Sequence, residues 1–187
     1  MVSLASLLLP IVVSAVAVFI ASMLVHMLLK YHANDFPAVP GEESVMDALR
    51  KFNLAPGDYM MPRCKTTKEM KTPEFTEKLK KGPVIIMTVL PNGEMGMGKS
   101  LLQWFVYCLI VSAFTAFVAL RALPAEQPRN AVMLLAGVVA FMGYALGMWP
   151  DSIWYKRKWS TTFKYTIDGL IFGVVTGAVF GCMWPHS

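Results

Sequence analysis

Four long apolar segments alternate with polar stretches along the chain. The first covers residues 3–29 and contains no Asp, Glu, Lys or Arg. The others cover residues 101–120, 131–149 and 170–184, the last with an apolar approach that begins at Phe163. A helix of roughly 20 mostly apolar residues crosses the hydrocarbon core of a bilayer. The pattern therefore predicts an integral membrane α-helical protein with four transmembrane helices.

Between the first two apolar segments lies the only sizeable polar region of the sequence, residues 31–99. Apolar spacings of three and four residues predict a helix over 42–53. The sequence Thr72-Pro73-Glu74 predicts a capped helix that ends near Lys81. The run from Val84 to Leu90 is rich in β-branched residues and predicts a strand. We expect a small α+β insertion between transmembrane helices 1 and 2.

The chain thus divides into three parts. An N-terminal transmembrane anchor occupies residues 1–30, the insertion occupies residues 31–99, and a three-helix transmembrane bundle occupies residues 100–187. Within the bundle, the loop 150–162 combines aromatic and basic side chains, which gather where a membrane meets water. We expect a short interfacial helix there, with lipid contacts from Trp154, Lys156, Arg157, Lys158 and Trp159.

Small residues recur at every third or fourth position in the last two apolar segments. This spacing places them on one face of a helix, where a second helix can approach closely. We expect the two stripes to pack against each other within the chain, and a contact between two copies of the chain is the alternative. The residues are Ala136, Ala140, Gly143 and Gly147 in the third segment and a glycine-zipper pattern, Gly169, Gly173, Gly177 and Gly181, in the fourth.

Composition and charge agree with a membrane protein and give it an orientation. Hydrophobic residues make up 56% of the chain and charged residues 16%. Of the 17 Lys and Arg residues, 11 lie in residues 30–99, four in 150–168 and two in 121–130. Because basic residues collect on the cytoplasmic side, we expect the insertion in the cytoplasm and both termini outside it. The net charge of +5 then reflects topology, and we expect membrane lipids, not nucleic acid, as partners.

One motif points to nucleotide chemistry. Residues 93–100 match the P-loop pattern GxxxxGK[ST], in which backbone N–H groups and the lysine hold phosphates. The match consists of Gly93, Gly98, Lys99 and Ser100. However, the helix that follows is predicted to be transmembrane, and one convincing strand does not make the parallel sheet that surrounds such a loop. We therefore favour a glycine-rich hinge with Lys99 at the membrane interface.

The acidic residue Asp168, at the start of the last apolar segment, is a second candidate. An ionisable side chain within a transmembrane segment is a functional hypothesis by default. Lys164 lies one helical turn earlier, so we favour an interfacial ion pair between the two side chains. A small transporter or channel with Asp168 at its mouth is the alternative.

No other pattern of chemistry-bearing residues is readable. The three cysteines, Cys64, Cys108 and Cys182, are far apart and show no metal-binding spacing. Methionines in the insertion offer soft ligands for Cu(I), but methionine is abundant throughout the chain, with 14 in all, and it commonly fills gaps in apolar cores. We therefore expect no catalytic residues, no metal, no cofactor and no enzymatic activity.

Three stretches, residues 82–93, 97–101 and 152–171, resemble those in a group of small, uncharacterised bacterial inner-membrane proteins. The resemblance implies a bacterial inner-membrane location and a similar four-span layout, and it implies no activity. With no catalytic set, the small-residue stripes favour a non-catalytic accessory, assembly or scaffold subunit that contacts other membrane protein subunits. The small transporter or channel is the first alternative, and a membrane-tethered nucleotide-binding protein is the second.

Overall fold

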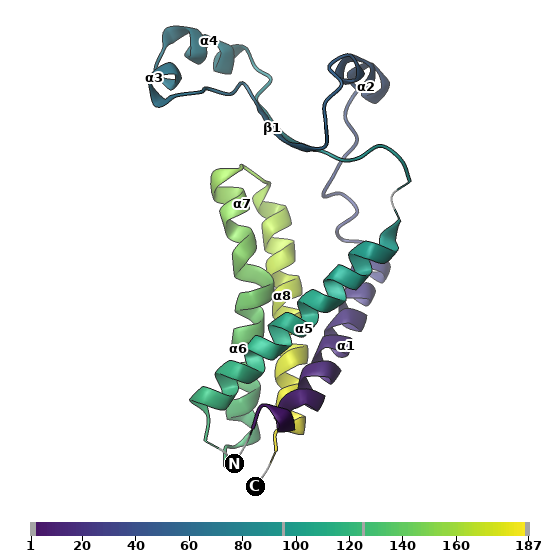
Figure 1. The fold of residues 1–187 in the computed structure, drawn as a ribbon, viewed down its shortest axis with the longest axis vertical. Helices are drawn as coiled ribbons and strands as arrows, with labels where there is room; N and C mark the ends of the chain where they lie inside the picture. The colour runs from purple at the N-terminus through teal and green to yellow at the C-terminus, as the bar shows by residue number, and fades with distance from the viewer. Residues whose placement is uncertain (1–2, 95, 125, 186–187) are drawn as a thin grey trace. The chain divides into compact units, whose positions relative to one another are not determined.

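The structure, a computed structural model, describes residues 3–94, 96–124 and 126–185. Within these residues, four helical spans are long and apolar enough to cross a membrane: Ala5–Leu28, Met97–Ala122, Arg129–Trp154 and Trp159–Met183. The prediction of four such helices is therefore confirmed. The chain divides into two compact units (Figure 1), a helical unit formed by Met1–Phe36 with Gly96–Ser187, and a polar unit formed by Pro37–Met95.

The helical unit contains the four spans, and two of them are interrupted. The first ends in a π-helical turn, and the third continues from α6 through a 3-10 turn into the short helix α7. The helix α6 begins directly after Pro128, whose fixed backbone suits the start of a helix. The elements are η1 (Ala5–Leu7), α1 (Leu8–Met23), η2 (Leu24–Leu28), α5 (Met97–Ala122), α6 (Arg129–Ala145), η3 (Leu146–Met148), α7 (Trp149–Trp154) and α8 (Trp159–Met183).

Buried apolar side chains join the spans to one another. The helices α6 and α8 run alongside each other, and α1 lies against both α5 and α8 (Figure 1). One core cluster joins Leu7 of η1 to Phe180 of α8 and to Trp184. A second cluster joins Val18 of α1 to Phe172 of α8. The beginning of the first span and the end of the last span therefore lie at the same end of the helical unit.

The four glycines of α8 lie against α6. A Cβ atom added to Gly173 would stand 2.8 Å from the carbonyl oxygen of Gly137. One added to Gly177 would stand 2.5 Å from the carbonyl oxygen of Met133. Gly169 and Gly181 are equally close to side chains of α6. The two helices approach so closely that these positions have no space for a side chain, which is the packing that small residues permit between membrane helices.

The face of α6 in this contact differs from the one that the sequence predicts. Gly143 lies against α5, and at Gly147 no atom lies within 4 Å of the place where a Cβ would stand. Ala136 and Ala140 are fully buried in the two core clusters. The α6 face in this contact carries Gly137 and Ala145 together with the larger Met133 and Phe141, and it lies one position along from the predicted Ala136 and Ala140.

The loop expected over 150–162 is shorter in the structure. The helices α7 and α8 occupy most of it, and residues 155–158 join the two helices. Trp159, at the start of α8, packs edge-on against Trp149, with 6.0 Å between the ring centroids. Trp154 is 75% exposed. A short helix is thus present, and an aromatic contact closes the turn between α7 and α8.

The polar unit consists, in the part that the structure describes, of three short helices and a two-stranded sheet. The strands β1 (Gly57–Met61) and β2 (Ile85–Val89) are antiparallel. The helices are α2 (Glu42–Arg50), α3 (Thr67–Met70) and α4 (Pro73–Lys81). As predicted, Thr72 caps α4, because its hydroxyl accepts a hydrogen bond from the backbone N–H of Phe75 at 3.2 Å. The helix α3 is not predicted, since four residues show no periodic pattern.

Replacing Gly177 by alanine should destabilise the contact between α6 and α8, because the added methyl group meets the carbonyl oxygen of Met133. We expect the cost of overpacking, about 1–3 kcal/mol, to exceed the gain in helix propensity of up to ~1 kcal/mol. Thermal unfolding of the purified protein in detergent would measure the change. The matched control is Gly147→Ala, which adds a methyl group in open space. Equal unfolding temperatures for the two variants would contradict the close contact.

Candidate functional site

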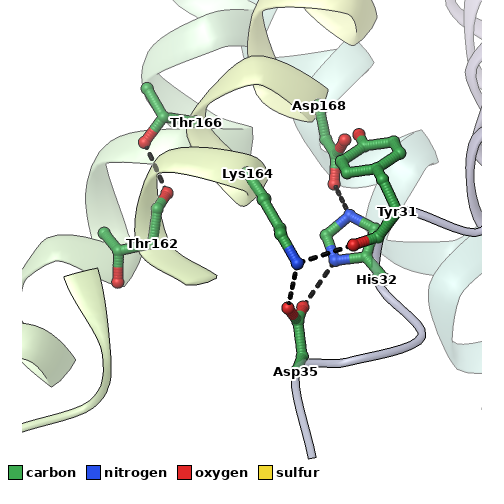
Figure 2. A network of polar contacts seen from close by, with 7 residues as sticks. All are labelled: Tyr31, His32, Asp35, Thr162, Lys164, Thr166 and Asp168. Carbon is green, nitrogen blue, oxygen red and sulfur yellow. Dashed lines mark hydrogen bonds and ion pairs between the residues drawn. The ribbon is translucent and has the colours of Figure 1, made fainter. Parts of the chain in front are cut away.

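Four ionisable side chains form a connected network near the start of α8 (Figure 2). Asp35 lies between Lys164 and His32: its Oδ1 accepts a hydrogen bond from Lys164 Nζ at 2.6 Å, and its Oδ2 lies 2.7 Å from His32 Nδ1. The other ring nitrogen of His32, Nε2, lies 2.8 Å from Oδ2 of Asp168. Both carboxyl groups are almost fully buried, since the side chains of Asp35 and Asp168 are 4% and 2% exposed.

Two elements bring these side chains together. The helix α8 carries Lys164 and Asp168 one turn apart and therefore on one face. The loop that follows η2 turns back on itself through backbone hydrogen bonds donated by Ala33 and Asp35. Lys164 donates to the carbonyl oxygen of Tyr31 at 2.6 Å as well as to the Asp35 carboxylate. One lysine thus attaches the loop to α8 at two points.

The predicted ion pair between Lys164 and Asp168 does not form. Each side chain meets the loop instead, Lys164 through Asp35 and Asp168 through His32. Residues 31–36 accordingly belong to the helical unit, whereas the sequence places them in the insertion. The spacing of residues along α8 cannot reveal these partners. Asp35 lies 129 residues before Lys164 in the chain, and His32 lies 136 residues before Asp168.

The network favours an ionised Asp35. Burial opposes the charge of this carboxyl group, but the hydrogen bonds and charges of Lys164 and His32 outweigh burial and hold the pKa of Asp35 below its ordinary value of 3.8. Such a group stabilises the folded state at pH values above its ordinary pKa, and this contribution is lost as the pH falls through the lowered pKa. At neutral pH Asp35 is therefore a carboxylate, which only accepts hydrogen bonds.

The state of Asp35 determines how His32 can bind Asp168. Because the Asp35 carboxylate cannot donate, Nδ1 of His32 must carry the proton between them. A neutral imidazole has a single N–H, so its Nε2 would then be a bare acceptor 2.8 Å from a carboxylate oxygen of Asp168. Two acceptors repel each other at this distance. A proton or another cation must therefore lie between His32 and Asp168.

A third ligating side chain and an unused oxygen lie beside this pair. His26 stands on the π-helical turn η2, with 4.7 Å between its ring centroid and that of His32. The ligand atoms of His26, His32 and Asp168 all lie within 4.8 Å of one another. The other carboxyl oxygen of Asp168, Oδ1, is buried and has no hydrogen-bond partner among the described residues. The sequence predicts no metal ligand here, because no short spacing joins these positions.

A cavity of about 520 Å³ opens beside the cluster. Its wall comes from α1, η2, α5, α6, η3 and α8, and it is mainly apolar, with methionine and aromatic side chains. His26 and Asp168 are part of its lining, so the cavity reaches the cluster. The aromatic lining residues are Trp104, Tyr107, Tyr144, Tyr165 and Phe172. A mostly apolar cavity with a few converging polar groups is the usual form of a binding site.

The basic loop expected at the interface also reaches the cluster. The guanidinium of Arg157 lies over the ring of Tyr165, 5.1 Å from its centroid, and 3.9 Å from a carboxyl oxygen of Asp151. Tyr165 in turn lies beside the His32 ring, with 4.9 Å between the centroids. Lys156 and Lys158 are exposed and do not take part.

The P-loop-like residues lie in a different setting from a phosphate-binding loop. Gly98, Lys99 and Ser100 form part of the first turn of α5, and Gly93 belongs to the polar unit. The preceding strand, β2, pairs antiparallel with β1, and the described part of the chain contains no parallel sheet. The supporting layers of a nucleotide-binding domain are thus missing from this part of the chain.

Replacing Asp35 by asparagine should destabilise the helical unit, because it removes the carboxylate that Lys164 and His32 share. We expect a loss of roughly 1.5–3 kcal/mol, as for a hydrogen bond to a charged group. Unfolding in detergent at neutral pH would measure it. The matched control is Asp151→Asn, because Asp151 is 42% exposed and its ion pair with Arg157 is long, at 3.9 Å. Such exposed pairs contribute about 0–1 kcal/mol, so equal losses in the two variants would contradict a buried network.

The helical unit therefore holds two histidines, two carboxyl groups and a lysine beside an aromatic cavity. Comparisons with protein-family models, with curated proteins and with solved structures found no match to this chain. A function for the site therefore has to be argued from the geometry of its residues.

Proposed function

We propose that this protein is a small multi-pass membrane protein that binds and moves cations, in the class of transporters or channels. The observation that carries the proposal is the separation of 2.8 Å between His32 Nε2 and Asp168 Oδ2. A proton, or another cation in its place, must lie between these atoms, and Asp168 lies almost fully buried in a helix that is able to span a membrane. Ionisable side chains in such positions are costly and usually belong to ion or proton paths.

The surroundings of Asp168 support a path more than a purely structural pair. The cavity reaches Asp168 and His26 from between the long apolar helices. His26 lines the cavity, so a cation in the cavity can approach the buried pair past this side chain. If His32 and Asp168 formed only a structural pair, the cavity beside them would have no role. The buried Oδ1 of Asp168 would also be left without a partner for no gain.

This proposal ranks above the accessory subunit that the small-residue stripes favour. The four glycines of α8 contact α6 of the same chain, so they are already used within it. A subunit role, and contacts with other membrane protein subunits, stay predictions. Nucleotide binding ranks lowest, because the sheet before the motif has two antiparallel strands.

We further infer a location in a bacterial inner membrane, with the polar unit in the cytoplasm and both termini outside it. The distribution of basic residues supports this orientation, since 11 of the 17 Lys and Arg residues lie in residues 30–99. The basic loop between α7 and α8 falls on the same side when four spans cross the bilayer. With an even number of spans, both ends of the chain lie on the same side of the membrane.

Labelling of Cys64 would test the orientation, because this cysteine lies in the polar unit and is partly exposed. In intact spheroplasts, we expect a membrane-impermeant maleimide to leave Cys64 unlabelled, since the bilayer separates them. Permeabilising the membrane should make it react. Cys64→Ser serves as the control that subtracts any labelling of Cys108 and Cys182. Reaction of Cys64 in intact spheroplasts would place the polar unit outside.

Replacing Asp168 by asparagine should slow cation movement strongly, because the amide keeps the shape of the side chain and removes its charge. The purified protein would be reconstituted into liposomes that contain a pH-sensitive dye, with a parallel set that contains a dye for divalent metals. We expect a cation gradient to drive a dye response with the wild-type protein. The rate should fall about tenfold or more in Asp168→Asn, which corresponds to at least ~1.4 kcal/mol.

The matched control for this experiment is Asp151→Asn, which removes an acid of the same helical unit that lies outside the cluster. Its rate should equal that of the wild-type protein. If neither dye responds above the level of protein-free liposomes, the proposed function is refuted.

A further inference from the structure

Two imidazole rings and one carboxyl group converge beside the cavity. His26, His32 and Asp168 each offer a ligand atom within 4.8 Å of the others. Imidazole nitrogen and carboxylate oxygen are the ligands that Zn²⁺ and its first-row neighbours accept, and three protein ligands are typical of a metal site that keeps one position open. The set contains no thiolate, and it is too rich in nitrogen for Mg²⁺ or Ca²⁺.

The distances fit a metal ion after small movements. Four-coordinate Zn²⁺ binds nitrogen and oxygen at about 2.0–2.2 Å, which places neighbouring ligand atoms roughly 3.4 Å apart. His32 Nε2 and Asp168 Oδ2, now 2.8 Å apart, need to separate slightly. His26 needs to come closer, and rotation of an exposed side chain on the π-helical turn η2 allows this. Such turns within helices occur frequently at functional sites.

The residues behind His32 already orient it as a ligand. Asp35 accepts the Nδ1 proton of His32 at 2.7 Å, which leaves Nε2 directed toward Asp168. Histidines that bind metals generally donate their other N–H in this way, often to a carboxylate. Lys164 holds the second oxygen of Asp35 at 2.6 Å. Asp35 therefore sets the orientation of the ring, and a metal ion has to replace the proton that otherwise lies between Nε2 and Asp168.

Asp168 gives an independent indication that a ligand belongs here. Asp168 is 1% exposed, and its Oδ1 has no hydrogen-bond partner among the described residues. A buried carboxyl oxygen without a partner is unfavourable. A proton between Nε2 and Oδ2 would leave Oδ1 as it is, whereas a metal ion bound to the carboxylate can satisfy both oxygens.

We propose that this is a site for a divalent transition metal, Zn²⁺ or a first-row neighbour. His26, His32 and Asp168 are the ligands, Asp35 is the positioning residue for His32, and the open position faces the cavity. The inference rests on the proposed cation-moving function and names the class of ion for the same site.

The test uses the full chain without a polyhistidine tag, purified in mild detergent and freed of metal with a chelator. Calorimetric titration with Zn²⁺ should give one bound ion per chain, and Co²⁺ should give the visible absorption of a four-coordinate site. His26→Ala should weaken Zn²⁺ binding about tenfold or more, since even an outer-shell partner is worth 10–100-fold. This exposed residue is outside the network of hydrogen bonds, so we expect the variant to fold. Asp151→Asn should bind like the wild-type protein.

A second variant separates ligation from a structural effect. His26→Cys keeps a metal ligand but exchanges nitrogen for sulfur, so its Co²⁺ complex should gain a thiolate-to-cobalt charge-transfer band that the His26→Ala protein lacks. No binding by the wild-type protein, or equal Zn²⁺ affinities for the wild-type and His26→Ala proteins, would overturn the metal site. An Asp168-dependent response of the pH dye would then still support cation movement, so the two failures are distinguishable.

Discussion

A carboxyl group that is cut off from water has to share a proton with a partner or face a positive charge, and Asp168 imposes this condition on the helical unit. Its partner, His32, comes from a loop 136 residues earlier in the chain. His32 can face it only while Asp35 accepts the other ring proton, and Lys164 keeps Asp35 in place. Asp168 and Lys164 together therefore attach the loop to α8.

The parts of the fold that depend on near neighbours could be predicted, and those that depend on distant ones could not. The four spans and the Thr72 cap follow from residues within a few positions of one another. The α6 side of the glycine contact could not be assigned correctly, because Gly137 and Ala145 give the face next to the predicted stripe small residues as well. The cluster depends on the joint placement of a loop and the last helix. A signal was present, since ionisable residues at 32 and 35 follow the first span and Asp168 begins the last. An even number of intervening crossings puts these positions at the same end, but their pairing also depends on the turn in the loop.

The helical unit combines a tightly packed pair of helices with a more adaptable space. The glycine contact leaves no space for a side chain between α6 and α8, so Asp168 is held on a rigid support. The cavity between α1, α5 and α8 is partly lined by methionines, whose unbranched side chains adapt their shape easily. His26 belongs to the wall on that side. A cation is thus offered one fixed acid and one imidazole that is free to move toward it.

The position of the cluster along the chain also has a consequence for synthesis. The loop with His32 and Asp35 leaves the ribosome long before α8, which carries Lys164 and Asp168. Chains grow at about 5–20 residues per second, so a loop made 129 residues earlier waits roughly 6–26 s for its partners. During this time its polar side chains lack these partners. A chain that stops before α8 never acquires them, so its loop has neither the Lys164 contacts nor the Asp168 contact that hold it.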